Sequence, residues 1–261
     1  MQRNQIIHPV VFYDKEIRTK KDTFWGDMTK IPETRLKYED DLFPTASSML
    51  IELLRKNVNY NAFREAQDKI HTTCRSQAIL LSATLKAKDI PARARSGFAK
   101  YIRNNGVGVD HWIAEYYNVT FKRWVLVDAD MCGSETDFDI YDIPRDNFIF
   151  GAEAWLGFRN GTIKKDELYY AGYDYEKREE YIMEALLRGL FYDFHCLMND
   201  EIIFLHLPSY IYHKNFNLDE LEMKELDHLA TLMLNPNETF DELLNVWNSN
   251  LKFRIMSGAL N

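Results

Sequence analysis

Cysteine is scarce in this chain, and the spacing of the few cysteines excludes several classes of protein. The three cysteines, Cys74, Cys132 and Cys196, are far apart and odd in number, so they do not make a framework of disulfides. They also lack the Cys-x-x-Cys pairs that are typical of structural zinc sites. This usage of cysteine predicts a reducing environment, and we expect a cytoplasmic location.

Long apolar runs and an excess of basic charge are also absent. No stretch of about 18 consecutive apolar residues is present, which argues against a membrane span. The opening residues, MQRNQIIHPVVFYDKE, lack the cleavage pattern of a signal peptide and are interpreted as mature protein. Acidic residues number 40 and basic residues 32, so the composition argues against nucleic acid or an anionic membrane as the partner.

Helical periodicity is present on both sides of a short β-rich region. Helices are predicted from Thr45, over about residues 60–70, and from residue 74 to the segment before Pro91, where proline disfavours the helical backbone. Apolar residues at the three-to-four spacing of a buried face support the first of these helices: Met49, Leu50, Leu53 and Leu54. Further helices are expected over residues 176–199, 218–234 and 238–250.

Three short runs after Pro91 are rich in aromatic and β-branched residues. RARSGFAKYI, HWIAEYYNV and RWVLVDA are separated by turn-like breaks, and they predict three strands of an antiparallel sheet. The sequence shows no internal repeat. The predicted fold class is therefore α+β, with a single domain over residues 1–261, a core over about 45–150 and a helical C-terminal extension over about 151–261.

Cys74 is predicted to stand at the start of a helix. Thr72 and Thr73 are good N-cap types, and Gln77 is placed where a reciprocal capping partner is expected. A thiol becomes a strong nucleophile as the thiolate, and the partial positive charge at a helix N-terminus stabilises that anion. The position of Cys74 therefore favours a nucleophilic role.

A histidine and an aspartate occupy matching positions on two predicted strands. His111 opens one strand and Asp128 closes the next, so an antiparallel hairpin would bring them to the same end of the sheet. Asp130 is two residues further along, on the same strand face, and is the alternative carboxylate. A thiol, an imidazole and a carboxylate that orients the imidazole are the components of nucleophilic acyl transfer.

Four strings in this order, CRSQAILL, DIPARARSGF, DHWIAEYY and RWVLVDAD, resemble the transglutaminase-like superfamily of papain-like cysteine enzymes. The resemblance covers about residues 70–130 and implies a papain/transglutaminase-like core in which the catalytic helix packs on an antiparallel sheet. It implies that Cys74 is the nucleophile, His111 the base and acid, and Asp128 the orienting carboxylate. It also implies that no metal or cofactor is needed.

The reaction that the resemblance implies is acyl transfer through a thioester, with a peptide, amide or acyl-group substrate and either water or an amine as the acceptor. The backbone N–H of Cys74 is the expected first donor to the oxyanion, and Gln67 and His71 are candidates for the second donor. Trp112 and Arg95 are candidates for substrate contact, although Arg93 and Arg95 are otherwise predicted to form a solvated strand face.

Three other interpretations of the same residues stay open. One is a catalytically inactive scaffold of the same fold that binds proteins. A second is a calcium loop within DADMCGSETDFD, which has acidic residues and a glycine at suitable offsets: Asp128, Asp130, Gly133 and Asp139. The third is a zinc site with mixed ligands: His71, Cys74, His111 and Cys132. The sequence does not predict the oligomeric state.

Overall fold

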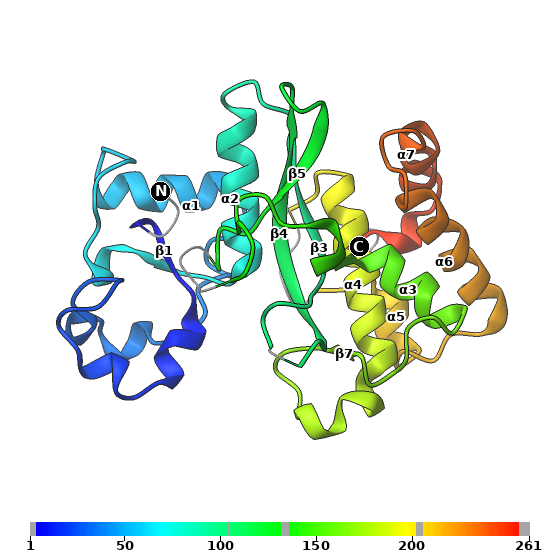
Figure 1. Ribbon diagram of the computed structural model, residues 1–261, viewed down its shortest axis with the longest axis horizontal. Coiled ribbons are helices and arrows are strands. Elements are labelled where there is room, and N and C mark those ends of the chain that lie inside the picture. The colour runs from blue at the N-terminus through cyan, green and yellow to red at the C-terminus, as the bar shows by residue number, and fades with distance from the viewer. Residues whose placement is uncertain (1–3, 104, 132–135, 202–205, 256–261) are drawn as a thin grey trace. The chain divides into compact units, whose positions relative to one another are not determined.

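The computed structural model shows a chain of mixed helices and strands, and its described residues are 4–103, 105–131, 136–201 and 206–255 (Figure 1). The α+β class predicted from the sequence is confirmed. Among the described residues, no helix is both long enough and apolar enough to cross a membrane.

The chain divides into two compact units whose sequence segments interleave. Unit 1 comprises residues 1–93 and 113–143, and unit 2 comprises residues 94–112 and 144–261. Strand β4 (Gly108–Asn118) contributes residues to both units. The single domain predicted for residues 1–261 stays a prediction.

Among its described residues, unit 1 contains two α-helices, and each begins directly after a threonine. Helix α1 (Ala46–Lys56) follows Thr45, whose hydroxyl accepts the Ser48 N–H at 3.1 Å, and the Ser48 hydroxyl accepts the Thr45 N–H at 3.0 Å. Helix α2 (Cys74–Lys86) follows Thr73, and its C-cap is Ala87, before the proline. Both predicted helices are therefore confirmed.

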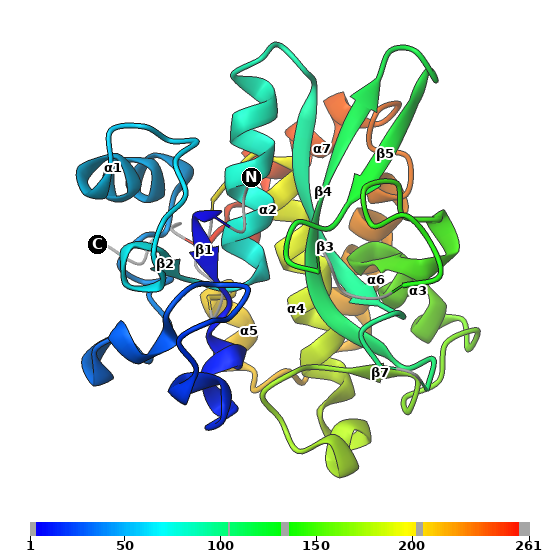
Figure 2. The ribbon, with the colours of Figure 1, turned by 60° about the vertical axis from the view of Figure 1, so that its left-hand side comes forward.

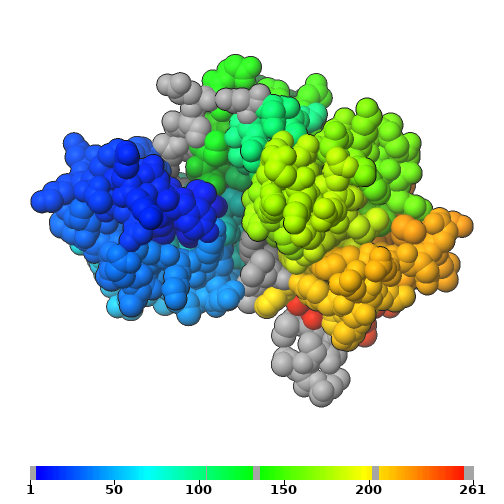
Figure 3. Space-filling model, turned by 90° about the horizontal axis from the view of Figure 1, so that it is seen from below, coloured from blue at the N-terminus to red at the C-terminus, as the bar shows by residue number. Residues whose placement is uncertain are grey.

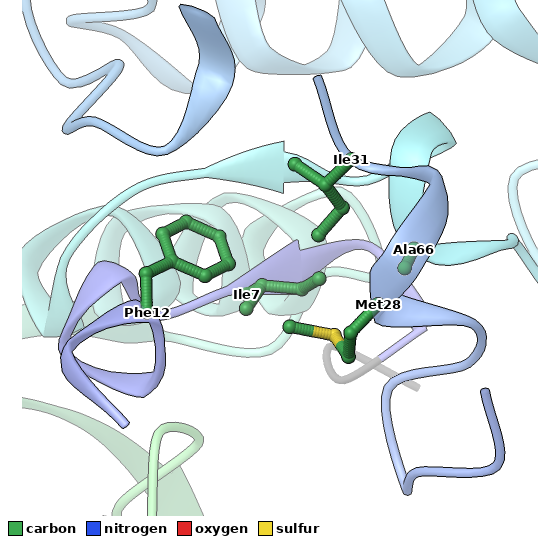
Figure 4. Close-up of a cluster of buried hydrophobic side chains, with 5 residues drawn as sticks. All are labelled: Ile7, Phe12, Met28, Ile31 and Ala66. Atoms are coloured by element: carbon green, nitrogen blue, oxygen red, sulfur yellow. The ribbon is translucent and has the colours of Figure 1, made fainter. Parts of the chain in front are cut away.

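The N-terminal segment of unit 1 packs beside the segment that leads to α2. Strand β1 (Ile6–Ile7) pairs in parallel with β2 (Ile70–His71), and the two strands lie side by side in Figure 2. A buried apolar cluster holds this region together (Figure 4): Ile7, Phe12, Met28, Ile31 and Ala66. Short 3₁₀ helices complete the segment: Pro9–Tyr13, Ile17–Thr19, Met28–Lys30, Glu33–Arg35 and Ala66–Asp68. Part of the N-terminal segment, drawn in blue, is visible at the molecular surface in Figure 3.

The prediction of a helix over residues 60–70 is wrong. The structure has turns there, followed by a short 3₁₀ helix and β2. Asparagine side chains compete with a helix by accepting nearby backbone N–H groups: Asn57 accepts from Asn59 at 2.9 Å, and Asn59 accepts from Asn61 at 3.0 Å.

The sheet has the strand order β5-β4-β3-β6, with β7 paired to β4. In unit 1, β4 pairs with β5 (Arg123–Val127) in an antiparallel hairpin whose register runs from Ala114 opposite Val127 to Asn118 opposite Arg123. The three predicted strands are confirmed as β3 (Ala92–Ala99), β4 and β5.

Two short strands of unit 2 were not predicted. Strand β6 (Phe148–Phe150) pairs with β3 in the antiparallel sense, and β7 (Leu168–Tyr169) pairs with β4 in the parallel sense. The approach of β6 requires a glycine, because a Cβ atom at Gly97 would lie 2.1 Å from the carbonyl oxygen of Ile149.

Helices make up most of the other described residues of unit 2. The α-helices are α3 (Gly151–Arg159), α4 (Ile182–Leu197), α5 (Ser209–His213), α6 (Glu220–Met233) and α7 (Phe240–Ser249), and short 3₁₀ helices cover Arg145–Asn147, Tyr175–Tyr181 and Leu251–Phe253. Helix α3 packs against α4 and α6. The predicted C-terminal helices over 218–234 and 238–250 are confirmed as α6 and α7, whereas the helix predicted from residue 176 begins as a 3₁₀ helix and becomes α-helical at Ile182.

Candidate functional site

Cys74 is the first residue of α2, as the sequence predicts. Its side chain is 7% exposed, so the thiol is largely covered. The two residues before it and the three after it are also buried, and all five are polar: Thr72, Thr73, Arg75, Ser76 and Gln77. The sulfur-bearing residue therefore lies in a buried but polar stretch of unit 1.

Thr73 occupies the N-cap position of α2 without capping it. Its hydroxyl donates to a carboxylate oxygen of Asp40 at 2.7 Å, and no cap hydrogen bond from this side chain to the helix is formed. Asp40 also accepts the Thr73 N–H at 3.2 Å and the Ser76 hydroxyl at 3.1 Å, and it is 5% exposed. The buried carboxylate of Asp40 thus holds the start of the helix.

Gln77 does not form the predicted capping pair with Thr73, and that prediction is wrong. Its side-chain amide instead donates to the carboxylate of Asp130. The same carboxylate lies 4.0 Å from the Nε2 atom of His8. Asp130, the alternative orienting carboxylate, is therefore bound to α2 within unit 1.

Asp128 directly follows β5 and is fully buried. One of its carboxylate oxygens accepts the N–H groups of Asp130 at 2.9 Å and Met131 at 3.0 Å, which fixes the turn after the strand. Its own N–H donates to the carbonyl of Ile140 at 3.1 Å. These bonds fix the backbone position of Asp128 at the end of the hairpin.

His71 and Gln67, the candidates for the second oxyanion donor, lie in the segment before α2. The Nδ1–H of His71 donates to the carbonyl oxygen of Arg35 at 2.7 Å, the ring lies edge-on against Phe12, and burial lowers the pKa of His71. The main-chain carbonyl of Gln67 accepts from the Arg35 guanidinium at 2.5 Å, while its side-chain oxygen is buried without a partner among the described residues.

His111 and Trp112 lie on the part of β4 that belongs to unit 2. The side chain of His111 is 4% exposed, and its ring lies edge-on to Tyr101 with the centroids 6.4 Å apart. The indole of Trp112 packs against Tyr192 at 5.5 Å between ring centroids. Cys74 and Asp128 thus belong to unit 1, and His111 belongs to unit 2.

The prediction that Arg93 and Arg95 form a solvated strand face is wrong. Arg95 is 2% exposed and forms a bidentate ion pair with the buried carboxylate of Asp193, at 2.7 and 2.8 Å, in unit 2. Arg93 pairs with Glu115 at 2.5 Å in unit 1. The buried ion pair accounts for the position of Arg95, and its contact with substrate stays a prediction.

Metal ligation has little support from the described residues. Among them, no group of three or more His, Cys, Asp and Glu side chains is arranged to hold a metal ion. Cys132 of the alternative zinc site and Gly133 of the alternative calcium loop lie outside the described residues.

The sequence analysis did not identify two residues that lie near Cys74, Asp40 and Tyr38. Burial raises the pKa of Tyr38 well above its ordinary value, with smaller contributions from the Tyr13 hydroxyl at 3.2 Å and from the charges of Asp40 and Cys74. The separation of more than 30 positions between these residues and Cys74 explains why no local pattern indicated them.

No protein-family model matches the chain, and neither the curated proteins nor the solved structures contain a match to it.

Proposed function

We propose that this protein is a cysteine-dependent acyl-transfer enzyme with Cys74, His111 and Asp128 as its triad, built on a papain/transglutaminase-like core. The observation that carries the proposal is the position of Cys74 as the first residue of α2. An α-helix leaves its first four N–H groups without intrahelical partners, and their partial positive charge favours an anion at this end.

The chemistry would proceed in two steps. His111 takes the proton of the Cys74 thiol, the sulfur attacks the carbonyl carbon of the substrate, and the backbone N–H of Cys74 donates to the developing oxyanion. The carbon–nitrogen bond then breaks, the leaving amine takes a proton from His111, and a thioester remains on Cys74. Water or an amine, deprotonated by His111, attacks the thioester, the carbon–sulfur bond breaks, and the released sulfur takes the proton back from His111.

The assignment of Asp128 as the orienting carboxylate follows the family resemblance, in which an aspartate ends the strand that begins with a tryptophan. Asp128 directly follows β5 and is fully buried. Asp130 is bound by the Gln77 amide. We therefore favour Asp128 over Asp130.

The experiment that tests the proposal is labelling with a small electrophile that reacts covalently with nucleophilic thiols. Peptide mass spectrometry identifies the labelled cysteine. We expect stoichiometric labelling of Cys74, complete loss in Cys74→Ala, and labelling slowed by about 10²-fold or more in His111→Ala. Cys196, which is also buried, serves as the internal control. Labelling of Cys196 with an inert Cys74 would remove the enzymatic proposal.

A second candidate function is a catalytically inactive scaffold that binds other proteins. The burial of Cys74 favours it, because a buried cysteine is commonly a small apolar core residue. The scaffold predicts that Cys74 reacts only as fast as Cys196 and that His111→Ala leaves this rate unchanged. The labelling experiment therefore separates the two functions.

A further inference from the structure

His195 of unit 2 is buried between two oxygen acceptors. It lies in the last turn of α4 and is fully buried. Its Nδ1 atom is 2.7 Å from a carboxylate oxygen of Asp200, and its Nε2 atom is 3.1 Å from the carbonyl oxygen of Phe253. A neutral imidazole carries one N–H group and one lone pair, whereas an imidazolium carries two N–H groups. Only the protonated ring can therefore donate to both oxygens at once.

The hydrogen bond to Phe253 connects α4 to the C-terminal segment, which we define as residues 240–253 (α7 and the 3₁₀ helix that follows it). Trp247 of this segment meets the His195 ring edge-on with the ring centroids 5.1 Å apart, and the Phe253 ring packs against Phe191 of α4 at 5.8 Å. Both partners of the hydrogen bond are buried. Loss of the donor would therefore leave a buried carbonyl oxygen unsatisfied, which weakens the hold on the segment.

Asp200 is the charged group that bonds directly to the His195 ring. It lies in the loop after α4, and its side chain is 42% exposed. The partial negative charge at the C-terminal end of α4 also favours a cation at position 195. Other charged side chains on the elements packed against the ring lie beside neighbouring groups: Arg254 over Trp247, Lys252 over Phe253 and paired with Glu225, and Asp241 and Glu242 in the first turn of α7.

Loss of the His195 proton forces a choice between the two acceptors. The bond to Asp200 is the shorter one and its acceptor is an anion, so it is the stronger of the two. The carboxylate therefore keeps the remaining proton on Nδ1. The lone pair of Nε2 then faces the Phe253 carbonyl, and an attractive contact becomes a repulsive one.

We propose that His195 is a protonation-dependent latch: the imidazolium holds the C-terminal segment on α4, and the neutral ring loosens it. The stabilisation is present at low pH and is lost as the pH rises and the ring gives up its proton. Loosening uncovers an apolar face of α4, because Phe253 packs against Phe191 and Trp247 packs against Phe194. The latch lies within unit 2 and does not depend on the proposed function.

The test measures hydrogen–deuterium exchange of the full chain at pH 5.5 and pH 9. Peptide rates are converted to protection factors, so that the intrinsic pH dependence of exchange cancels. We expect the protection of residues 240–253 to be about three- to tenfold lower at pH 9, in line with the net contribution of one hydrogen bond. Peptides from α3, in the same unit, should keep their protection.

Two variants isolate the part of this change that belongs to the latch. In Asp200→Asn the amide can donate to Nδ1, so the neutral ring keeps its proton on Nε2 toward Phe253, and we expect equal protection at both pH values. Because the Asp200 side chain is partly exposed, this change leaves the packing of the segment intact. His195→Gln has no titrating ring and should also show no dependence on pH. Any change that it keeps reports other titrating groups, such as Cys196, and is subtracted from the wild-type change.

Three results would overturn the latch. The first is wild-type protection of residues 240–253 that is equal at the two pH values after this subtraction. The second is a loss of protection that α3 shares, because it indicates opening of the whole unit. The third is an Asp200→Asn variant that keeps the wild-type dependence on pH, because Asp200 then does not decide which ring nitrogen keeps the proton.

Discussion

The two units bury polar groups in different ways. In unit 2, α4 is buried along its whole length except at Met183 and Glu184, and most of its side chains are apolar. The charged side chains of this helix form ion pairs: Asp193 with the buried Arg95, and the buried Arg188 with the partly exposed Glu184. In unit 1, every residue from 69 to 80 is buried, and most residues in the first part of this stretch are polar.

This difference between the units concerns the partners that satisfy their buried polar groups. A buried polar group is costly unless it is hydrogen-bonded. Unit 2 satisfies its buried charges pairwise, whereas unit 1 uses the adjacent Glu39 and Asp40 to bind the segment around His71 and Thr73. We infer that apolar packing is the main source of stability in unit 2. In unit 1, hydrogen-bonded polar groups occupy buried positions next to Cys74 that apolar side chains could otherwise fill.

The largest expected effect is a loss of stability when the buried Arg95–Asp193 ion pair of unit 2 is broken. Asp193→Ala leaves the Arg95 guanidinium buried without its carboxylate, and we expect the free energy of unfolding to fall by about 3–5 kcal/mol. Urea unfolding followed by circular dichroism measures this loss. Glu115→Ala, which removes the partner of the less buried Arg93, is the matched control and should cost less. Equal losses for the two variants would contradict this description of unit 2.

A smaller effect is expected in unit 1 from Glu39→Ala. Glu39 accepts from Arg35 at 2.8 and 2.9 Å and from the His71 N–H at 2.8 Å, so its loss removes the carboxylate that both groups share. We expect a loss of about 2 kcal/mol in the free energy of unfolding, together with slower labelling of Cys74. Glu33→Ala removes an exposed ion pair with Arg18 and should change stability by less than about 1 kcal/mol. If Glu39→Ala loses stability while the labelling rate of Cys74 stays unchanged, the hydrogen bonds of Glu39 do not position the site.

The smallest effect depends on pH and concerns Lys69. Burial lowers the pKa of Lys69 to about 8 from its ordinary value of 10.5, so above pH 8 the folded chain loses this proton while the unfolded chain keeps it. The free energy of unfolding should therefore rise between pH 8 and 10.5, by about 1–2 kcal/mol relative to Lys69→Met at the same pH. The exposed Lys88→Met serves as the control and should follow the wild type. A difference between wild type and Lys69→Met that stays constant over this range would show that Lys69 is not desolvated.

Local patterns in the sequence predicted much of the fold. Helices α1, α2, α6 and α7 have regular apolar spacing or good capping residues, and β3 to β5 are long enough to show a strand composition. Strands β6 and β7 are too short for any periodicity to be visible. The start of α4 was misplaced because the polar run before Ile182 forms a 3₁₀ helix, which has a similar composition.

The surroundings of the site were harder to predict because they depend on contacts between distant residues. The position of Cys74 at a helix start follows from its neighbours, and the structure agrees. The partners of Thr73 and Gln77 are 33 and 53 positions away, and Arg95 finds Asp193 at a separation of 98. Spacing alone gives no sign of such pairs, so the sequence predicted local caps and a solvated face in their place.

The interleaved segments of the two units have a consequence for synthesis on the ribosome. Unit 1 lacks its β4–β5 hairpin until Val127 has emerged and is complete only at residue 143, and unit 2 begins with residues 94–112 but gains its α-helices only afterwards. Neither unit can therefore be completed from the first 93 residues alone, and truncation at any single point between residues 94 and 143 removes segments from both units. Deletion variants for expression or fragment complementation must keep both halves of each unit.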